Sequence, residues 1–354
     1  MKLTSRHLAI LVTLISLLIG IGASLSFTMT LGESPLEVAQ ILLMGAIGSP
    51  TSIGYSLFYA TPLIFTGLSV AWALKAGLFN IGAEGQMTVG GVAMAVTGIL
   101  LHQLSPWLAW PLALTAGFAA GAFFGWFVGW LKVYRGVHEV LGSILLNFVS
   151  YGVAGLFILN IFRNPDSASP ETVEIGEGFR LTLLEGFGGK SPLNVAFLIA
   201  LVVAAIVDVV IRRSKKGLYL RWSGGSGEFA RRSGVSISRE TISAMAISGG
   251  LAGVAGASAV LGYMHKAREG FAAGAGFVGI AVALLGRSNA WGVVAAALLF
   301  GSLQKGSLDL DIDTRTISRD LAIVMQALIV IAVAARPVIE RPLREWLDRR
   351  SAVE

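Results

Sequence analysis

The sequence predicts an all-α polytopic membrane protein of about ten transmembrane helices, forming a single domain over residues 1–354. Of its 354 residues, 55% are hydrophobic and only 14% are charged, and the mean hydropathy is +0.74. Soluble globular domains carry about 25% charged residues, so the composition excludes a soluble fold. The apolar residues are grouped in runs, and most runs approach the roughly 20 residues that a helix needs to cross the hydrocarbon core.

Composition also narrows the function. The chain has no cysteine, which excludes disulfides, thiolate metal sites and cysteine nucleophiles. Its net charge of +6 is compatible with nucleic-acid binding, but the Lys and Arg residues are concentrated in a few loops. Membrane topology explains that distribution better. We therefore expect the lipid bilayer as a partner, and neither a nucleic acid nor a metal ion.

The apolar runs define the predicted spans. The first run follows a short basic N-terminus, and its length of about 22 residues favours a retained span over a cleaved signal peptide. After this run, Pro35 predicts the start of a short helix that ends near Gly48, on the outer surface. The ten predicted spans are residues 8–29, 55–74, 77–101, 111–131, 137–162, 192–211, 241–264, 271–285, 290–303 and 317–335.

The positions of the basic residues predict the orientation. About 19 of the 27 Lys and Arg residues lie inside if both termini are cytoplasmic, which agrees with the positive-inside rule. The longest and most basic inner segment is 212–239, and residues 336–354 form a cytoplasmic tail. The exceptions to the rule include Lys266 and Arg268, which fall in a predicted outer turn. The predicted outer segments after the fifth span are 163–191, 265–270 and the acidic loop 304–316.

The third predicted span contains polar residues. Asn80, Glu84 and Thr88 are spaced i, i+4, i+8, which places them on one face of a helix. A carboxylate at bilayer depth is costly, so such a residue normally faces a protein interior or a water-filled path. We interpret this face, together with Gln86, as part of a solute pathway. The alternative is that Glu84 only hydrogen-bonds a neighbouring helix.

The fifth predicted span repeats this pattern. Glu139, Ser143 and Asn147 are again spaced i, i+4, i+8, and this stripe is the natural partner of the first one. The adjoining His-Glu pair is not the HExxH zinc motif, because Gly142 stands where the second His is needed. The predicted pathway or gate residues are Asn80, Glu84, Gln86, Glu139, Ser143 and Asn147.

Glycine patterns predict close packing. Gly121, Gly125 and Gly129 form a small-xxx-small face of the kind that lets two membrane helices approach each other. Residues 274–279, GAGFVG, match GxGxxG, but no βαβ unit surrounds them, so they predict close packing or a broken helix instead of dinucleotide binding. The sequence contains no GxxxxGK[ST], so ATP must be hydrolysed elsewhere.

Three segments resemble one family of membrane proteins: GLFNIGAEGQM at 77–87, GVHEVLGSILLNFV at 136–149 and SGGLAGVAGA at 248–257. They resemble permease subunits of bacterial ABC importers in the branched-chain amino acid, simple-sugar and nucleoside group, and most closely the nucleoside and simple-sugar branch. The resemblance implies a type II ABC-importer-like fold. It also implies alternating-access transport of a small polar solute, a nucleoside first and a simple sugar next.

The resemblance further implies the surroundings of the chain. Its expected partners are a cytoplasmic ABC ATPase, a homologous or identical second permease subunit, and an extracytoplasmic solute-binding protein. The expected location is the cytoplasmic (inner) membrane of a bacterium. The chain would be a transport subunit and not an enzyme, and it would bind no cofactor, because the ATPase subunit uses the ATP.

Permeases of this family carry a short cytoplasmic coupling helix that contacts the ATPase. The matching stretch here ends in Gly234-Val235 as the family pattern does, but its start departs from the usual Asn-Pro-x-Ala-Ala. The basic residues of the same loop also suit an anchor to anionic lipids. The predicted coupling residues are Gly227, Glu228, Phe229, Ala230, Arg231, Arg232, Ser233 and Gly234.

Two other function classes compete with a permease. An ion-driven secondary transporter could use Glu84 as its intramembrane acid. A membrane enzyme or scaffold is the second, but His138 lies at the end of a span and no nucleophile–base pair is evident. The basic inner loop and the resemblance favour the permease over both.

Overall fold

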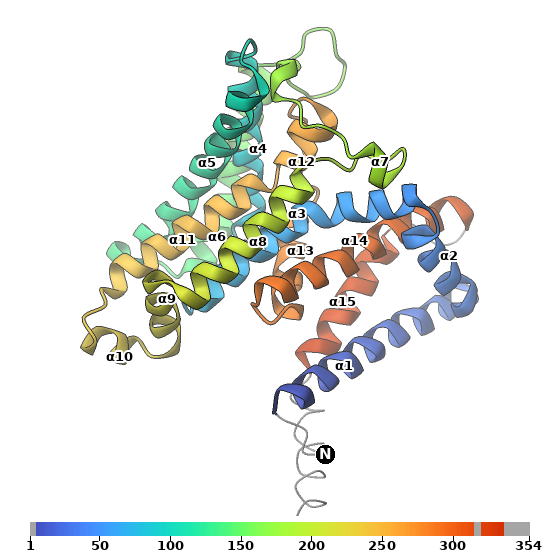
Figure 1. Cartoon of the computed structure of the whole chain (residues 1–354), viewed down its shortest axis with the longest axis horizontal. Helices are drawn as coiled ribbons and strands as arrows, with labels where there is room; N and C mark the ends of the chain where they lie inside the picture. The colour runs from blue at the N-terminus through green and yellow to red at the C-terminus, as the bar shows by residue number, and fades with distance from the viewer. Residues whose placement is uncertain (1–4, 315–319, 336–354) are drawn as a thin grey trace, which may run out of the picture. The chain divides into compact units, whose positions relative to one another are not determined.

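The computed structural model describes residues 5–314 and 320–335, and every regular element within these residues is a helix (Figure 1). Extended segments of the described residues are joined only by isolated β-bridges. The prediction of an all-α protein is therefore confirmed. The chain divides into two compact units, residues 53–301 and a smaller unit of 1–52 with 302–354. The predicted tail 336–354 lies outside the described residues.

The smaller unit is built around a helix pair from the two ends of the chain. Its described elements are α1 (Ser5–Thr28), η1 (Met29–Leu31), α2 (Pro35–Ile47), the C-terminal part of α14 (Ala290–Asp313) and α15 (Leu321–Ala334). α1 packs along α15, where a Cβ on Gly20 would lie 2.7 Å from the Cα of Ile329. The chain then bends by 119° into α2, which confirms the helix predicted after Pro35. A hydrophobic core joins these helices through Val38, Leu42, Leu310 and Met325.

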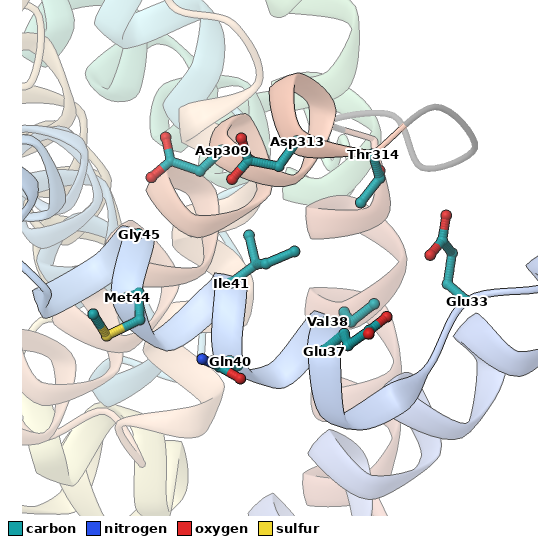
Figure 2. A pocket seen from close by; sticks show the side chains of 10 residues that line it. All are labelled: Glu33, Glu37, Val38, Gln40, Ile41, Met44, Gly45, Asp309, Asp313 and Thr314. Atoms are coloured by element: carbon teal, nitrogen blue, oxygen red, sulfur yellow. The ribbon is translucent and has the colours of Figure 1, made fainter.

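The predicted acidic loop 304–316 is wrong as far as residue 313, because α14 continues to Asp313. Within this helix Lys305 forms an i,i+4 ion pair with Asp309, a pairing that supports helical structure. This unit has a pocket of about 740 Å³. Figure 2 shows the side chains that line it, among them Glu37 from α2 and Asp309 and Asp313 from α14. Asp309, Asp311 and Asp313 of the predicted loop thus lie on a helix, and Asp309 and Asp313 line a pocket.

The larger unit contains most of the helices. They are α3 (Pro50–Lys75), α4 (Ala83–Leu100), α5 (Pro106–Arg135), α6 (Glu139–Gly155) with the π-helical η2 (Leu156–Ile161), α8 (Ala196–Arg213), α9 (Lys215–Gly225), α10 (Gly227–Arg232), α11 (Ile237–Val254) with α12 (Ala257–Ala259) and the π-helical η4 (Val260–Met264), α13 (Ala275–Leu285) and the N-terminal part of α14. α4, α5 and α11 pack against one another and form the centre of this unit.

The small-residue face predicted on α5 is confirmed as a packing surface. A Cβ on Gly121 would lie 2.2 Å from the carbonyl oxygen of Gly249, and one on Gly125 would lie 2.1 Å from that of Met245. No side chain fits at such distances, so only glycine allows α5 and α11 to approach this closely.

The predicted number of ten spans is not confirmed. Within the described residues five helices are long and apolar enough to cross a membrane, or six if the bent pair α1–α2 counts as one span. The predicted span 271–285 contains only α13, whose 11 residues extend about 16 Å at 1.5 Å per residue. This is about half of a 30 Å hydrocarbon core. The five helices are Pro50–Lys75, Pro106–Arg135, Glu139–Ile161, Ile237–Met264 and Ala290–Asp313.

Residues 162–195 form a folded loop that contains η3 (Glu177–Phe179) and α7 (Glu185–Gly188). In this loop Glu171 accepts a hydrogen bond of 2.9 Å from Lys266, and its other oxygen lies 3.5 Å from Nε of Arg268. Hydrogen bonds from Ser167 and Lys266 lower the pKa of the Glu171 carboxyl. The pairing accounts for two basic residues in a turn that is predicted to lie outside.

Candidate functional site

The third predicted span does not begin where the sequence pattern places it. Residues 76–82 form a non-helical turn after α3, and α4 begins only at Ala83. The reason is local: the side-chain oxygen of Asn80 accepts a hydrogen bond of 3.0 Å from the backbone N–H of Gly82, a contact that competes with helix formation. Asn80 therefore does not share a helix face with Glu84, and that part of the prediction is wrong.

The side chain of Asn80 is fully buried and joins three helices to the turn. Its Nδ2 lies 2.8 Å from Oε1 of Gln86 and 2.8 Å from Oγ of Ser248, and its Oδ1 accepts from Nε2 of Gln86 at 3.2 Å. Ser248 in turn donates to the carbonyl oxygen of Ser69 at 2.7 Å. The network connects α3, α4 and α11.

Glu84, on the first turn of α4, caps the N-terminus of α13. Its Oε1 accepts a hydrogen bond of 2.8 Å from the N–H of Gly274, and its Oε2 accepts one of 2.6 Å from the N–H of Gly276. A carboxylate at a helix N-terminus is favourable because it meets free N–H groups and the positive end of the helix dipole. Glu84 is 4% exposed, and these bonds offset the cost of its burial.

The glycine-rich segment 274–279 forms the helix N-terminus that Glu84 caps. Gly274 has φ of +81°, a conformation that favours glycine, and α13 starts at the next residue. A Cβ on Gly276 would lie 2.2 Å from the backbone nitrogen of Glu84. The segment is thus the start of a short helix packed directly on α4, which confirms the packing interpretation of its GxGxxG pattern.

The second polar stripe meets the first at Asn147. Its Oδ1 accepts a hydrogen bond of 2.9 Å from the N–H of Gly85, and its Nδ2 donates to the carbonyl oxygen of Ile81 at 3.1 Å. Ser143, one turn earlier on α6, lies beside Gly82. A Cβ added to Gly82 would lie 3.1 Å from the Cβ of Ser143. α6 is therefore fastened to the end of the turn and to the first turn of α4. We call the group of buried polar residues around this turn the polar hub: Ser69, Asn80, Glu84, Gln86, Asn147 and Ser248.

Glu139 is not part of this hub. It lies on the first turn of α6 and forms an ion pair of 2.6 Å with Lys132 near the end of α5. Nδ1 of His138 lies 3.5 Å from the same carboxylate. The structure therefore brings five of the six predicted pathway residues to one place and Glu139 to another. The role of all six in a pathway stays a prediction.

The predicted coupling residues form a short helix. α10 spans Gly227–Arg232, and the hydroxyl of Ser226 caps it by accepting the N–H of Phe229 at 3.2 Å. After α10, the chain turns at Gly234, whose φ is +81°, and the N–H of Val235 donates to the carbonyl oxygen of Ala230 at 2.9 Å. A capped helix thus occupies the predicted position, and its contact with an ATPase stays a prediction.

The two faces of α10 differ. Ala230 is fully buried, whereas Phe229 is 52% exposed and Arg231 is also exposed. The ring of Trp222 on α9 meets that of Phe229 edge-on, with centroids 5.3 Å apart. α9 packs on α8 and α11, so it connects α10 to the larger unit (Figure 1). We call α9 and α10, residues 215–234, the coupling segment.

Sequence reasoning missed two members of the polar hub, Ser69 and Ser248. Both hydroxyls lie in apolar runs, where periodicity has no signal for a partner on another helix. Ser248 does open the segment SGGLAGVAGA, so the resemblance identified its neighbourhood but not its hydrogen bonds.

Several known proteins are similar to this chain in sequence. The family described as "Branched-chain amino acid transport system / permease component" matches residues 52–334. A guanosine ABC transporter permease of Bacillus subtilis is 35% identical over 327 residues, 92% of this chain and 93% of that protein. A nucleoside ABC transporter permease of Lactococcus lactis is 30% identical, over 94% of this chain and 92% of that protein. A glucose ABC transporter permease of Haloferax volcanii is 30% identical, over 85% and 80% respectively. With a family match over most of its length, this chain belongs to the branched-chain amino acid transport system permease family.

Proposed function

We propose that this chain is a permease subunit of an ATP-driven ABC importer and that it moves a nucleoside across the membrane by alternating access. The observation that supports this most directly is α10, a capped helix that presents Phe229 and Arg231 to solvent. A six-residue helix has little intrinsic stability, so capping at both ends favours a defined surface for a partner.

The proposal includes the partners. A cytoplasmic ABC ATPase binds α10 and hydrolyses the ATP, so this chain itself is no enzyme and binds no cofactor. A second permease subunit, homologous or identical, completes the pathway, and a solute-binding protein delivers the solute from outside. The chain lies in the bacterial cytoplasmic (inner) membrane with both termini cytoplasmic.

A nucleoside is favoured over a simple sugar as the solute. The guanosine and nucleoside permeases match more than nine-tenths of this chain, at 35% and 30% identity. The glucose permease is also 30% identical but matches 85% of the chain, so a simple sugar is the second candidate.

The polar hub then shapes the gate without binding the solute. The carboxylate of Glu84 and the amides of Asn80 and Asn147 already bond to groups of the same unit. Both oxygens of Glu84 accept backbone N–H groups. This occupation, with the family membership, argues against an ion-driven transporter that would load and unload Glu84.

Uptake of labelled guanosine and labelled glucose tests the proposal, in cells that have or lack this chain and that contain its partner subunits. We expect guanosine uptake to be lost without the chain, and also lost when the phosphate-binding Lys of the ATPase is replaced. Loss of glucose uptake alone would overturn the assignment of the solute. Uptake that persists with the inactive ATPase but stops with a proton ionophore would overturn the importer assignment.

A further inference from the structure

The coupling segment touches the turn at the start of the polar hub through backbone atoms. A Cβ on Gly224, at the end of α9, would lie 2.4 Å from the carbonyl oxygen of Lys75 and 2.7 Å from the nitrogen of Gly77. In the other direction, a Cβ on Gly77 would lie 3.1 Å from the Cα of Gly224. The two backbones are therefore in direct contact, with no side chain between them.

The contact joins two segments, one that leads to α10 and one that leads to the polar hub. On one side, Gly224 is two residues from Ser226, the cap of α10. On the other side, Gly77 is three residues from Asn80, whose side chain bonds to α4 and α11. Gly77 has φ of +71°, so its own conformation also favours glycine.

We propose that the contact between Gly77 and Gly224 carries a displacement of the coupling segment into the polar hub, and from there to the N-terminus of α13. The proposal rests on the proposed function, in which an ATPase moves α10. It assigns a positioning role to two glycines and to a turn that contact neither ATP nor solute.

The physical argument is that the contact between the backbones of Gly77 and Gly224 is stiff. A contact between two backbones has no rotatable side chain that could absorb a displacement, and packed interiors deform little. Beyond the contact, the turn is tied to α6 through the bond between Asn147 and the carbonyl oxygen of Ile81. It leads directly to Glu84, which holds the N–H groups of Gly274 and Gly276. Movement of residues 76–82 therefore cannot occur without moving or breaking these bonds.

The attachment of α13 also supports the assignment. Its first turn is held by the carboxylate of Glu84 and by the hydroxyl of Thr66, which donates to the carbonyl oxygen of Ala275 at 3.1 Å. Because Glu84 follows residues 76–82 directly and bonds to the start of α13, a shift of that turn shifts the start of α13 with it.

The chain offers a matched pair of variants. Gly224→Ala adds a methyl group that must separate α9 from the turn, whereas Gly225→Ala adds the same group where no atom lies within 4 Å. Both glycines are exposed residues of the same helix, so propensity and solvation change alike. Any difference in transport between the two variants is therefore caused by the contact between Gly224 and the turn.

The test uses the complete complex in lipid vesicles, with ATPase, second permease and binding protein, and measures guanosine uptake and ATP hydrolysis together. We expect Gly224→Ala to assemble and to hydrolyse ATP within about twofold of the unchanged complex, while guanosine moved per ATP falls about tenfold. Gly225→Ala should match the unchanged complex in both. A purely structural role would lower assembly, uptake and hydrolysis in parallel.

Equal transport per ATP in both variants would overturn the inference. If Gly224→Ala does not assemble, hydrogen exchange on the unchanged complex decides: amides of residues 76–82 should change protection when a non-hydrolysable ATP analogue binds, and unchanged protection would overturn the inference. The unchanged complex tests the proposed function separately. If it moves no nucleoside or sugar with ATP, the proposed function fails, whatever the variants do.

Discussion

In the polar hub, Asn80, Glu84 and Asn147 are each at most 4% exposed, and their amides and carboxylate bond to groups of the same unit. In the coupling segment, Phe229 is 52% exposed, and Glu228 and Arg232 form an ion pair on the solvent-exposed side of α10. Both regions are conspicuous in the sequence, but they use their side chains for different purposes.

The difference shows how polar residues in a membrane protein should be interpreted. A buried polar group is costly unless it is hydrogen-bonded, so a fully bonded network stabilises one arrangement of its helices. Exposed aromatic and arginine side chains contribute little to folding and are typical of residues that dominate a protein interface. The comparison therefore predicts that variants of the hub lose stability, whereas variants of the exposed face of α10 lose a partner.

The largest effect is expected for Glu84→Ala. The variant leaves the N–H groups of half-buried Gly274 and buried Gly276 without an acceptor, at about 1–3 kcal/mol each, so stability should fall by about 2–6 kcal/mol. Thermal unfolding of the purified chain in detergent measures this loss. Glu84→Gln keeps one side-chain oxygen as an acceptor, so its unfolding temperature should lie between those of the unchanged chain and of Glu84→Ala. An unfolding temperature equal to that of the unchanged chain would contradict the capping role.

A smaller loss is expected for Asn147→Ala. Its two bonds, to the N–H of Gly85 and the carbonyl oxygen of Ile81, both disappear, and about 1–3 kcal/mol of stability should go with them. The matched control is Phe148→Ala, the next residue on α6, which is 66% exposed and should change the unfolding temperature less. If the two variants unfold alike, Asn147 does not hold the turn.

Phe229→Ala should leave thermal unfolding unchanged and weaken ATPase binding, because the ring is half-exposed and central in α10. We expect at least about tenfold less ATPase to co-purify, as for an interface residue of this kind, and a similar direction for Arg231→Ala. Full co-purification and full uptake in both variants would remove the coupling role from α10.

The smallest effect concerns pH and the outer loop. The pKa of Glu171 is lowered in the folded chain. The stability that its carboxylate contributes is therefore present above the ordinary pKa of 4.5 and is lost as the pH falls through the lower folded pKa. Protease cleavage within residues 163–175 should therefore increase as the pH falls below 4.5 and this carboxyl becomes protonated. Glu171→Gln should remove this pH dependence, and an identical acid response in that variant would assign it to other groups.

Much of this organisation could be predicted from the sequence. Apolar runs located most helices, and the glycines of α5 predicted the packing that Gly121 and Gly249 make. The start of α4 was not predictable from spacing, because Asn80 fits a helical stripe equally well until its bond to Gly82 is seen. Nor could periodicity show that Glu84 caps α13, since its partners lie 190 and 192 residues away in the chain.

The length of α14 was a different kind of error. Three Asp residues at alternate positions look like a solvated loop, but Lys305 pairs with Asp309 and the helix continues through them. The predicted number of ten spans also stays unconfirmed. Runs such as 271–285 are apolar enough, but glycines limit the helix within them to 11 residues.

The most direct test of the comparison is one co-purification experiment with the ATPase, run below the unfolding temperature on Asn147→Ala and Phe229→Ala side by side. The account predicts that the Asn147 variant retains the ATPase while the Phe229 variant loses at least about nine-tenths of it. Loss of the ATPase from the Asn147 variant, with full retention by the Phe229 variant, would contradict the separation between a hub that holds the helices and a segment that binds the partner.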